Sequence, residues 1–196
     1  MDLTTLARVK TLLYPWDRLD YDNTITQLIT DVSGQVESAL SRGTESAART
    51  EYFSAEPGQQ VFPLRGYPVA SITSVKEDLG DRAFTTDANT IDAELYTANN
   101  DTGALYIHGW ACVGGHKTLQ VVYTGGMAAT TAAFITAFPD LAAGVDAQVA
   151  LMLKRRDSIG FDSIGTAGSS SALSPLGFVI PLQDAIDRHR RVSVCG

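Results

Sequence analysis

The stretch from Gly109 to Thr118, GWACVGGHKT, contains the residue types of a phosphate-binding loop. Such a loop has the order G-x-x-x-x-G-K-[ST] and lies between a buried strand and a helix, so that backbone amides point at phosphate. Here His116 separates the glycine pair from Lys117, and the flanking segments LYIH and LQVVY both have the character of strands. The pattern therefore favours a glycine-rich hairpin connection, in which Gly114 and Gly115 supply positive φ angles.

Cys112 and His116 in the same stretch are spaced as C-x-x-x-H, which could begin a zinc site. Zinc requires three or four ligands, and the other histidines, His108 and His189, have no partner at ligand spacing. His108 could approach either residue across the hairpin, so a weak metal site stays open as an alternative. A surface pair is favoured, and we predict no metal ligand and no cofactor.

Three carboxylates, Asp17, Asp20 and Asp22, gather before the second predicted helix. Paired carboxylates can form an acid–base couple or a magnesium site. Acidic side chains at a helix start also complement the helix dipole, which is the simpler interpretation. Because the sequence also lacks a G-x-S-x-G elbow, we predict no catalytic residues and no enzymatic activity.

The composition is that of a globular protein, and its charge is unevenly distributed. The 196 residues are 44% hydrophobic and 19% charged, with a net charge of −7. No apolar run approaches the roughly 20 residues of a membrane-spanning helix. The first 150 residues are acidic and the remainder is basic. An acidic body argues against a grip on DNA phosphates, and a basic tail is suited to an acidic protein surface.

Hydrophobic periodicity predicts helices at 3–14, 22–42 and 139–158. The second has the clearest apolar stripe, with Gly34 as a weakening residue. Between the second and third helices, residues 50–126 contain five or six short β-type runs separated by turn residues. This texture predicts a small antiparallel sheet or sandwich.

Residues 160–177 are rich in glycine and serine and predict a flexible or extended linker. A short helix that begins at Pro181 follows the linker. Its apolar side chains could fold back on the chain's own body, or they could dock on another protein. The neighbouring basic residues also permit a nucleic-acid patch, which we rank last because aromatic residues for base stacking are missing nearby.

The order of elements predicts an α+β fold, in which a helical core carries an antiparallel β insertion. We expect an adaptor body at 1–159 and a linker with a C-terminal tail at 160–196. The tail ends in the short helix.

Taken together, this pattern resembles the head–tail connector proteins of tailed phages, also called adaptor or neck proteins. The resemblance spans nearly the whole chain, from LARVKTLLYP and DNTITQLITDVSGQVESAL through FPLRGYPVASITSVKED and TLQVVYTGGMA to FPDLAAGVDAQVALMLKRRDSIG and the terminal PLQDAIDRHRR. The phrases GYPV and VVYTGG are the most family-like. The architecture is also similar to the neck of gene transfer agents, which are phage-derived particles. The β insertion is larger than in the shortest connectors.

The resemblance implies a structural virion protein that is assembled in the host cytoplasm. Connectors of this family form a ring, usually twelve-fold, beneath the portal protein and extend the DNA channel toward the stopper or tail-terminator protein. DNA would pass through without sequence-specific binding, and no membrane is implied. The C-terminal segments of these connectors dock on the portal or on a neighbouring subunit. That role predicts an interface of Phe178, Leu182, Ile186, Arg188, Arg190 and Arg191 in this chain.

Two other interpretations stay open at this stage. One is a stopper or tail-completion protein, which lies one layer further down the neck. The other is a small metal- or nucleotide-binding enzyme that uses the Asp17–Asp22 cluster or the pair of Cys112 and His116.

Overall fold

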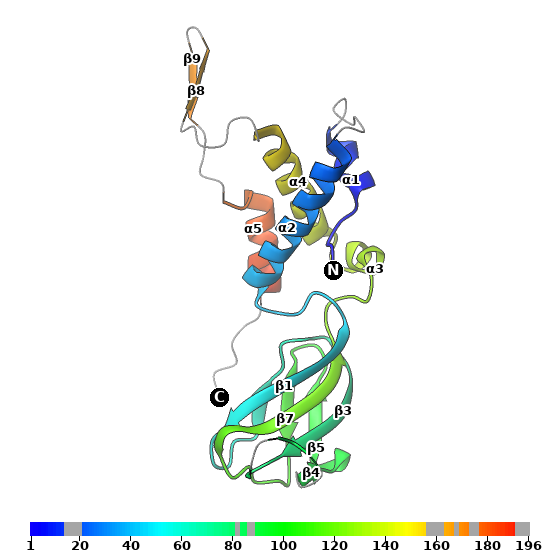
Figure 1. Ribbon diagram of the computed structural model, residues 1–196, viewed down its shortest axis with the longest axis vertical. Coiled ribbons are helices and arrows are strands. Elements are labelled where there is room, and N and C mark those ends of the chain that lie inside the picture. Colours follow the sequence, from blue (N-terminus) through cyan, green and yellow to red (C-terminus); the bar gives the residue numbers. More distant parts are fainter. Residues whose placement is uncertain are drawn as a thin grey trace. The chain divides into compact units, whose positions relative to one another are not determined.

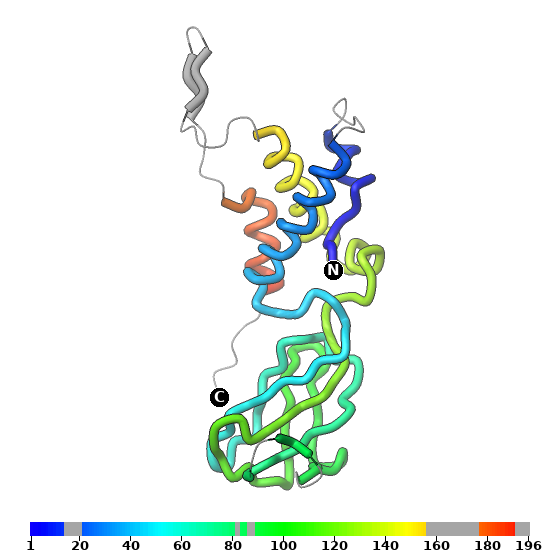
Figure 2. Tube along the Cα trace, in the orientation of Figure 1, coloured from blue at the N-terminus to red at the C-terminus, as the bar shows by residue number. Residues whose placement is uncertain are grey.

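The computed structural model describes residues 1–13, 21–80, 83–85, 89–155, 163–166, 169–172 and 177–190. The chain forms two compact units (Figure 1). The helical unit contains residues 1–40 and 131–190, and the β unit contains residues 41–130. The chain leaves the helical unit after α2, builds the β unit and then returns, as the colour gradient of Figure 2 shows. The predicted α+β class, a helical core with an antiparallel β insertion, is confirmed.

The helical unit is built from α1 (Leu6–Leu13), α2 (Asp22–Leu40), α3 (Thr131–Ala137), α4 (Pro139–Arg155) and α5 (Ile180–His189). Helix α4 packs against the other four helices. The apolar stripe of α2 is buried as its periodicity predicts, and Leu141, Val145 and Val149 form the buried face of α4.

Two helix boundaries differ from the predicted ones. Helix α1 begins at Leu6 instead of residue 3, because the Leu3 amide donates to Ser33 Oγ at 3.0 Å. Asp2 accepts hydrogen bonds from Thr30 Oγ1 at its side-chain carboxylate and from Thr131 Oγ1 at its backbone carbonyl. Helix α2 ends at Leu40 instead of residue 42, because Ser41 has a positive φ angle of 54°. Residues 14 and 156–158 of the predicted helices lie outside the described residues.

The β unit consists of two antiparallel sheets. One has the order β1-β7-β3-β4, from Ala47–Ala55, Gly115–Gly125, Val69–Glu77 and Asn89–Ile91. The other has the order β2-β6-β5, from Val61–Pro63, Ala104–Ile107 and Tyr96–Asn99, and the short 3-10 helix Ala93–Leu95 precedes β5. Their inward-facing side chains share one core that includes Phe62, Leu105, Leu119, Val121 and Tyr123. The predicted sandwich is therefore correct.

Two glycines at the end of β7 explain the phrase VVYTGG in physical terms. A Cβ atom on Gly125 would lie 2.2 Å from the Gly66 carbonyl oxygen, and one on Gly126 would lie 2.1 Å from the Glu45 carbonyl oxygen. Gly126 also has a φ angle of 145°, which side-chain-bearing residues rarely adopt. Backbone segments therefore approach β7 more closely than any other residue would allow.

The region predicted as a linker contains a short antiparallel hairpin that the sequence did not indicate. Strand β8 (Ser163–Thr166) pairs with β9 (Ser169–Ala172). Within the described ranges, no single helix is long and apolar enough to cross a membrane. Only α3 and α4 taken together meet that length and composition, and they join at a bend of 112°.

Candidate assembly surface

The glycine-rich stretch from Gly109 to Thr118 connects β6 with β7, so it joins two strands as predicted. Its backbone is held by a buried carboxylate on β3. Glu77 accepts hydrogen bonds from Trp110 Nε1 at 2.7 Å and from the Val113 amide at 2.9 Å. The Val113 amide, which in a phosphate-binding loop would face an anion, is therefore paired with a protein carboxylate. The stretch is nevertheless not a hairpin, because β6 belongs to the sheet β2-β6-β5 and β7 to the sheet β1-β7-β3-β4, so the chain crosses from one sheet to the other. Gly114 and Gly115 do have the predicted positive φ angles, of 83° and 140°.

The residues considered for zinc do not converge. Cys112 is buried, and burial together with the charge of Glu77 raises the pKa of its thiol to about 11. The thiol is thus protonated near neutral pH, whereas zinc binds the thiolate. His116 contacts Ser54 Oγ at 3.2 Å, and His108 contacts Thr97 Oγ1 at 3.2 Å. Among the described residues, no group of three potential metal ligands comes together.

The acidic cluster before α2 is described only in part. Asp22 forms an ion pair with Lys10 of α1, with 2.5 Å between Lys10 Nζ and Asp22 Oδ1. Asp17 and Asp20 lie outside the described residues. The described member of this cluster therefore joins two helices of the unit.

The C-terminal helix α5 is seated on α4 through a close backbone approach. A Cβ atom on Gly144 of α4 would lie 2.9 Å from Leu182 Cα and 3.0 Å from Leu182 Cβ. Gln148, which is nearly fully buried, donates to the Gly177 carbonyl oxygen at 3.3 Å and accepts from the Val179 amide at 2.8 Å. A glycine and an amide side chain on α4 thus position the chain that enters α5.

The other end of α5 is held by an aromatic and charged cluster. His189 Nε2 lies 3.0 Å from Asp140 Oδ2, and the His189 ring meets Phe138 edge to face at 5.3 Å. Arg188 Nη1 lies 3.4 Å from the same carboxylate. Partial burial would raise the pKa of Asp140, but its hydrogen bonds with His189 and the Leu141 amide, and the charges of His189 and Arg188, hold it below its ordinary value. The charged form of Asp140 is therefore the one that fastens α5.

The predicted interface residues divide into two groups. Leu182 and Ile186 are buried in the helical unit, at 0% and 2% exposure, which agrees with the fold-back alternative. Phe178 is half-buried, while Arg188 and Arg190 are exposed, and Arg191 lies outside the described residues. The prediction omitted Ile180, although this apolar residue next to a helix-starting proline is 77% exposed.

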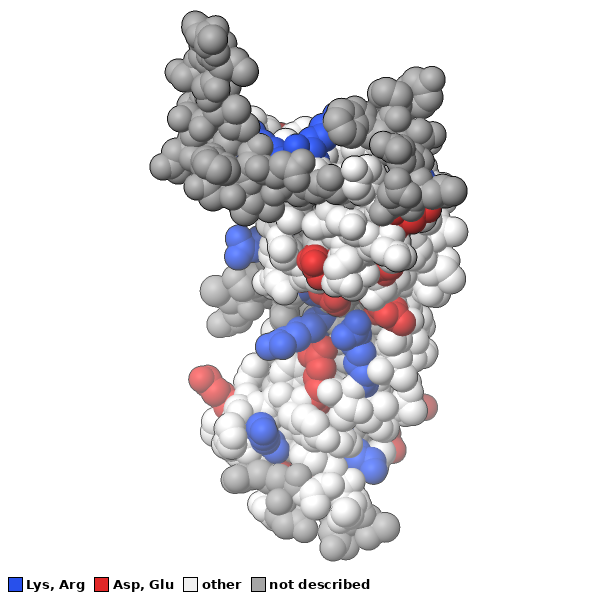
Figure 3. All heavy atoms as spheres, turned by 45° about the horizontal axis from the view of Figure 1, so that its top comes forward, with Lys and Arg blue, Asp and Glu red and all other residues white. Residues whose placement is uncertain are grey.

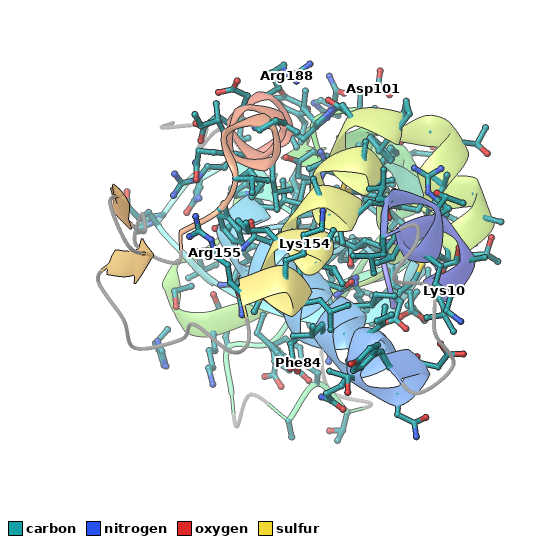
Figure 4. All side chains as sticks on the ribbon, turned by 90° about the horizontal axis from the view of Figure 1, so that it is seen from above. Lys10, Phe84, Asp101, Lys154, Arg155 and Arg188 are labelled. Atoms are coloured by element: carbon teal, nitrogen blue, oxygen red, sulfur yellow. The ribbon has the colours of Figure 1, made fainter. Side chains whose placement is uncertain are left out.

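Charges on the described surface are mixed in sign. On the face in Figure 3, basic and acidic side chains are interspersed, and the described residues there form no broad basic field. Lys154 and Arg155 lie in the last turn of α4, where cations favour the helix dipole (Figure 4). Arg156 lies outside the described residues. This distribution is unlike the continuous basic stripe that binds nucleic acid.

No protein-family model matches the chain. No curated protein sequence matches it either. Solved structures of gene transfer agent particles do share its fold. A chain in the virion of a native particle aligns with a TM-score of 0.61 and 18% identity, over 97% of this chain and 91% of that chain.

Two structures of the neck alone give the same result. A chain in the native neck computed with C12 symmetry has a TM-score of 0.58 and 18% identity, over 97% of this chain and 90% of that chain. A chain in the empty-particle neck computed with C6 symmetry has a TM-score of 0.57 and 17% identity, over 89% and 81%. The chain therefore shares the fold of chains found in the gene transfer agent virion and its neck.

Proposed function

We propose that this chain is a structural head–tail connector of a phage-like particle. It forms a ring, twelve-fold in the simplest case, that joins the portal of the capsid to the stopper or tail-terminator protein and extends the DNA channel. The observation that carries the proposal is the fold match over 97% of the chain, because that share includes both the helical unit and the β unit. The match to a neck computed with C12 symmetry supports the ring.

A non-enzymatic role agrees with how the reactive side chains are used. Glu77 holds a loop, Cys112 is a buried protonated thiol, and Asp140 fastens α5. Glu77 and Asp140 each hydrogen-bond to partners within their own unit. The net charge of −7 also suits a channel wall along which DNA slides without being held.

The C-terminal segment supplies the contact to the portal or to a neighbouring subunit in this proposal. Leu182 and Ile186 anchor α5 on the helical unit, while Phe178, Arg188 and Arg190 present its outer side. Ile180 is added to this surface because of its exposure. The division into a body at 1–159 and a tail at 160–196 stays a prediction.

Cross-linking of purified particles separates the adaptor from the other neck layers. With a lysine- and carboxylate-reactive reagent and mass spectrometry, we expect links from this chain to the portal protein, including links from Asp184 or Asp187 on α5. A subunit bound beneath the portal presents these carboxylates to portal lysines. Links to the tail tube alone would instead identify a stopper or tail-completion protein, and links only to capsid shell protein would contradict any neck position.

A further inference from the structure

Gly34 lies in the interior of α2, the longest helix described in the helical unit, and no residue that the structure describes requires a glycine there. A Cβ atom at this position would meet no atom within 4 Å, and the residue is exposed. Glycine in a helix interior is less favourable than almost any other residue. The isolated subunit would therefore be more stable with a side chain at position 34, and a contact outside the subunit would explain the glycine.

A shallow hollow lies at Gly34 on the outer face of α2. The hollow has a volume of about 770 Å³, and its lining includes Thr30, Asp31, Gly34, Ser38 and Phe178. Phe178, from the segment before α5, forms an apolar wall. Asp31 accepts a hydrogen bond from Gln27 Nε2 at 3.0 Å, and no cation pairs with it in the part of the chain that the structure describes.

A second surface, with an exposed apolar residue one helical turn from a cation, lies elsewhere on the same unit. Leu12 on α1 is 51% exposed and lines a separate groove between α1, α4 and α5. Arg8 lies one helical turn before Leu12 and lines the same groove, whose charged lining also includes Asp140, Asp146, Asp184 and Arg188. Its Nε and Nη2 atoms contact Asp146 Oδ2 at 3.1 and 2.9 Å, while Nη1 makes no hydrogen bond to any residue that the structure describes.

The hollow and this groove lie on different faces of the helical unit. They share no lining residue. Seen from above, α4 lies between α1 and α5, and α2 runs along another side of it (Figure 4). Two different surfaces on one subunit are what a head-to-tail contact requires if it is to close into a ring.

We propose that the hollow over Gly34 receives Leu12 of a second copy of this chain, with Arg8 of that copy pairing with Asp31. Residues 8 and 12 lie one turn apart on α1, and residues 31 and 34 lie nearly one turn apart on α2. A close crossing of the two helices can therefore satisfy both contacts at once. The inference rests on the proposed ring function and assigns its subunit contact to named residues.

Filling the hollow should have opposite effects on the free chain and on the assembly. Gly34→Gln introduces a better helix former, so the melting temperature of the purified chain should rise. The same side chain occupies the space that Leu12 needs. We expect incorporation into particles to fall about tenfold in a producer strain that lacks the native copy. Overpacking a close contact typically weakens binding by at least about this factor.

Thr24→Gln is the matched control, because Thr24 is exposed on the same helix and does not line the hollow. It should leave incorporation unchanged. Normal incorporation of Gly34→Gln would overturn the proposal, and so would an equal loss in both variants, since the effect would then not belong to the hollow.

A cysteine pair tests the contact itself. In a Cys195→Ser background, a chain with Leu12→Cys and Gly34→Cys is oxidised in purified particles and separated on a non-reducing gel. We expect a ladder of disulfide-linked multimers from the double variant and none from either single variant. If the double variant gave monomer alone in particles that contain the ring, this contact would be wrong but the connector function would stand. Particles without this chain in the neck would overturn both.

Discussion

Replacing Val121 by Asp is expected to unfold the β unit. Val121 is fully buried on β7, the strand that pairs with both β1 and β3, and it lies opposite Val75. An unpaired carboxylate in this core loses its water without gaining a partner. We expect the free energy of unfolding to fall by at least about 4 kcal/mol. Urea unfolding followed by the fluorescence of Trp110, in a Trp16→Phe background, measures the change in this unit.

Val122→Asp is the matched control. Because side chains alternate along a strand, Val122 points to the opposite face of the sheet and is only half-buried. It should cost clearly less than Val121→Asp. Equal stability of the parent and the Val121→Asp variant would mean that this face of β7 does not form the core.

Replacing Leu182 by Ala is expected to loosen α5 from the helical unit. Leu182 is fully buried against Gly144 of α4, so the substitution leaves a cavity at a close helix contact. Comparable truncations cost about 2–5 kcal/mol. Denaturation followed by far-ultraviolet circular dichroism should show the loss, and amide hydrogen exchange should accelerate across residues 180–189.

Ile180→Ala is the companion variant, because this neighbouring side chain is 77% exposed. It should leave the stability of the purified chain almost unchanged. If Ile180 docks on the portal, the substitution should weaken the attachment of this chain to the portal. If Leu182→Ala also left the stability unchanged, α5 would not belong to the core of its own subunit.

The sequence is sufficient to predict the elements whose pattern is local. Helices α2 and α4 repeat apolar residues at helical spacing, and β7 alternates Leu119, Val121 and Tyr123. These patterns determine which face is buried before any partner is known. Helix α3 was missed because its seven residues are too few to establish a period.

The placement of the tail helix could not be predicted, because it depends on residues that are distant in sequence. The periodicity of α5 indicates an apolar face but not which surface that face meets. That surface is specified by Gly144 and Gln148, which resemble ordinary helix residues until the backbone of the tail lies against them. The β8–β9 hairpin was missed for a related reason, since serine and glycine carry little strand propensity.

The sequence correctly indicated strands on both sides of the Gly109–Thr118 stretch. It did not indicate which residue holds this stretch in place. Glu77 lies far from this stretch in the sequence and at the end of another strand. A single glutamate after SVK has no feature that marks it as the partner of Trp110. Only the register of β3 against β7 brings the two together.

The central claim is that this chain forms a ring at the neck of a phage-like particle. An electron cryo-microscopy map of purified particles, with a compact tag inserted at Asp101 in the exposed turn between β5 and β6, tests it most directly. We expect a closed ring of extra density at the junction between the portal and the tail, with one tag per subunit. Tag density on the capsid shell, along the tail tube or at the tail tip would contradict it.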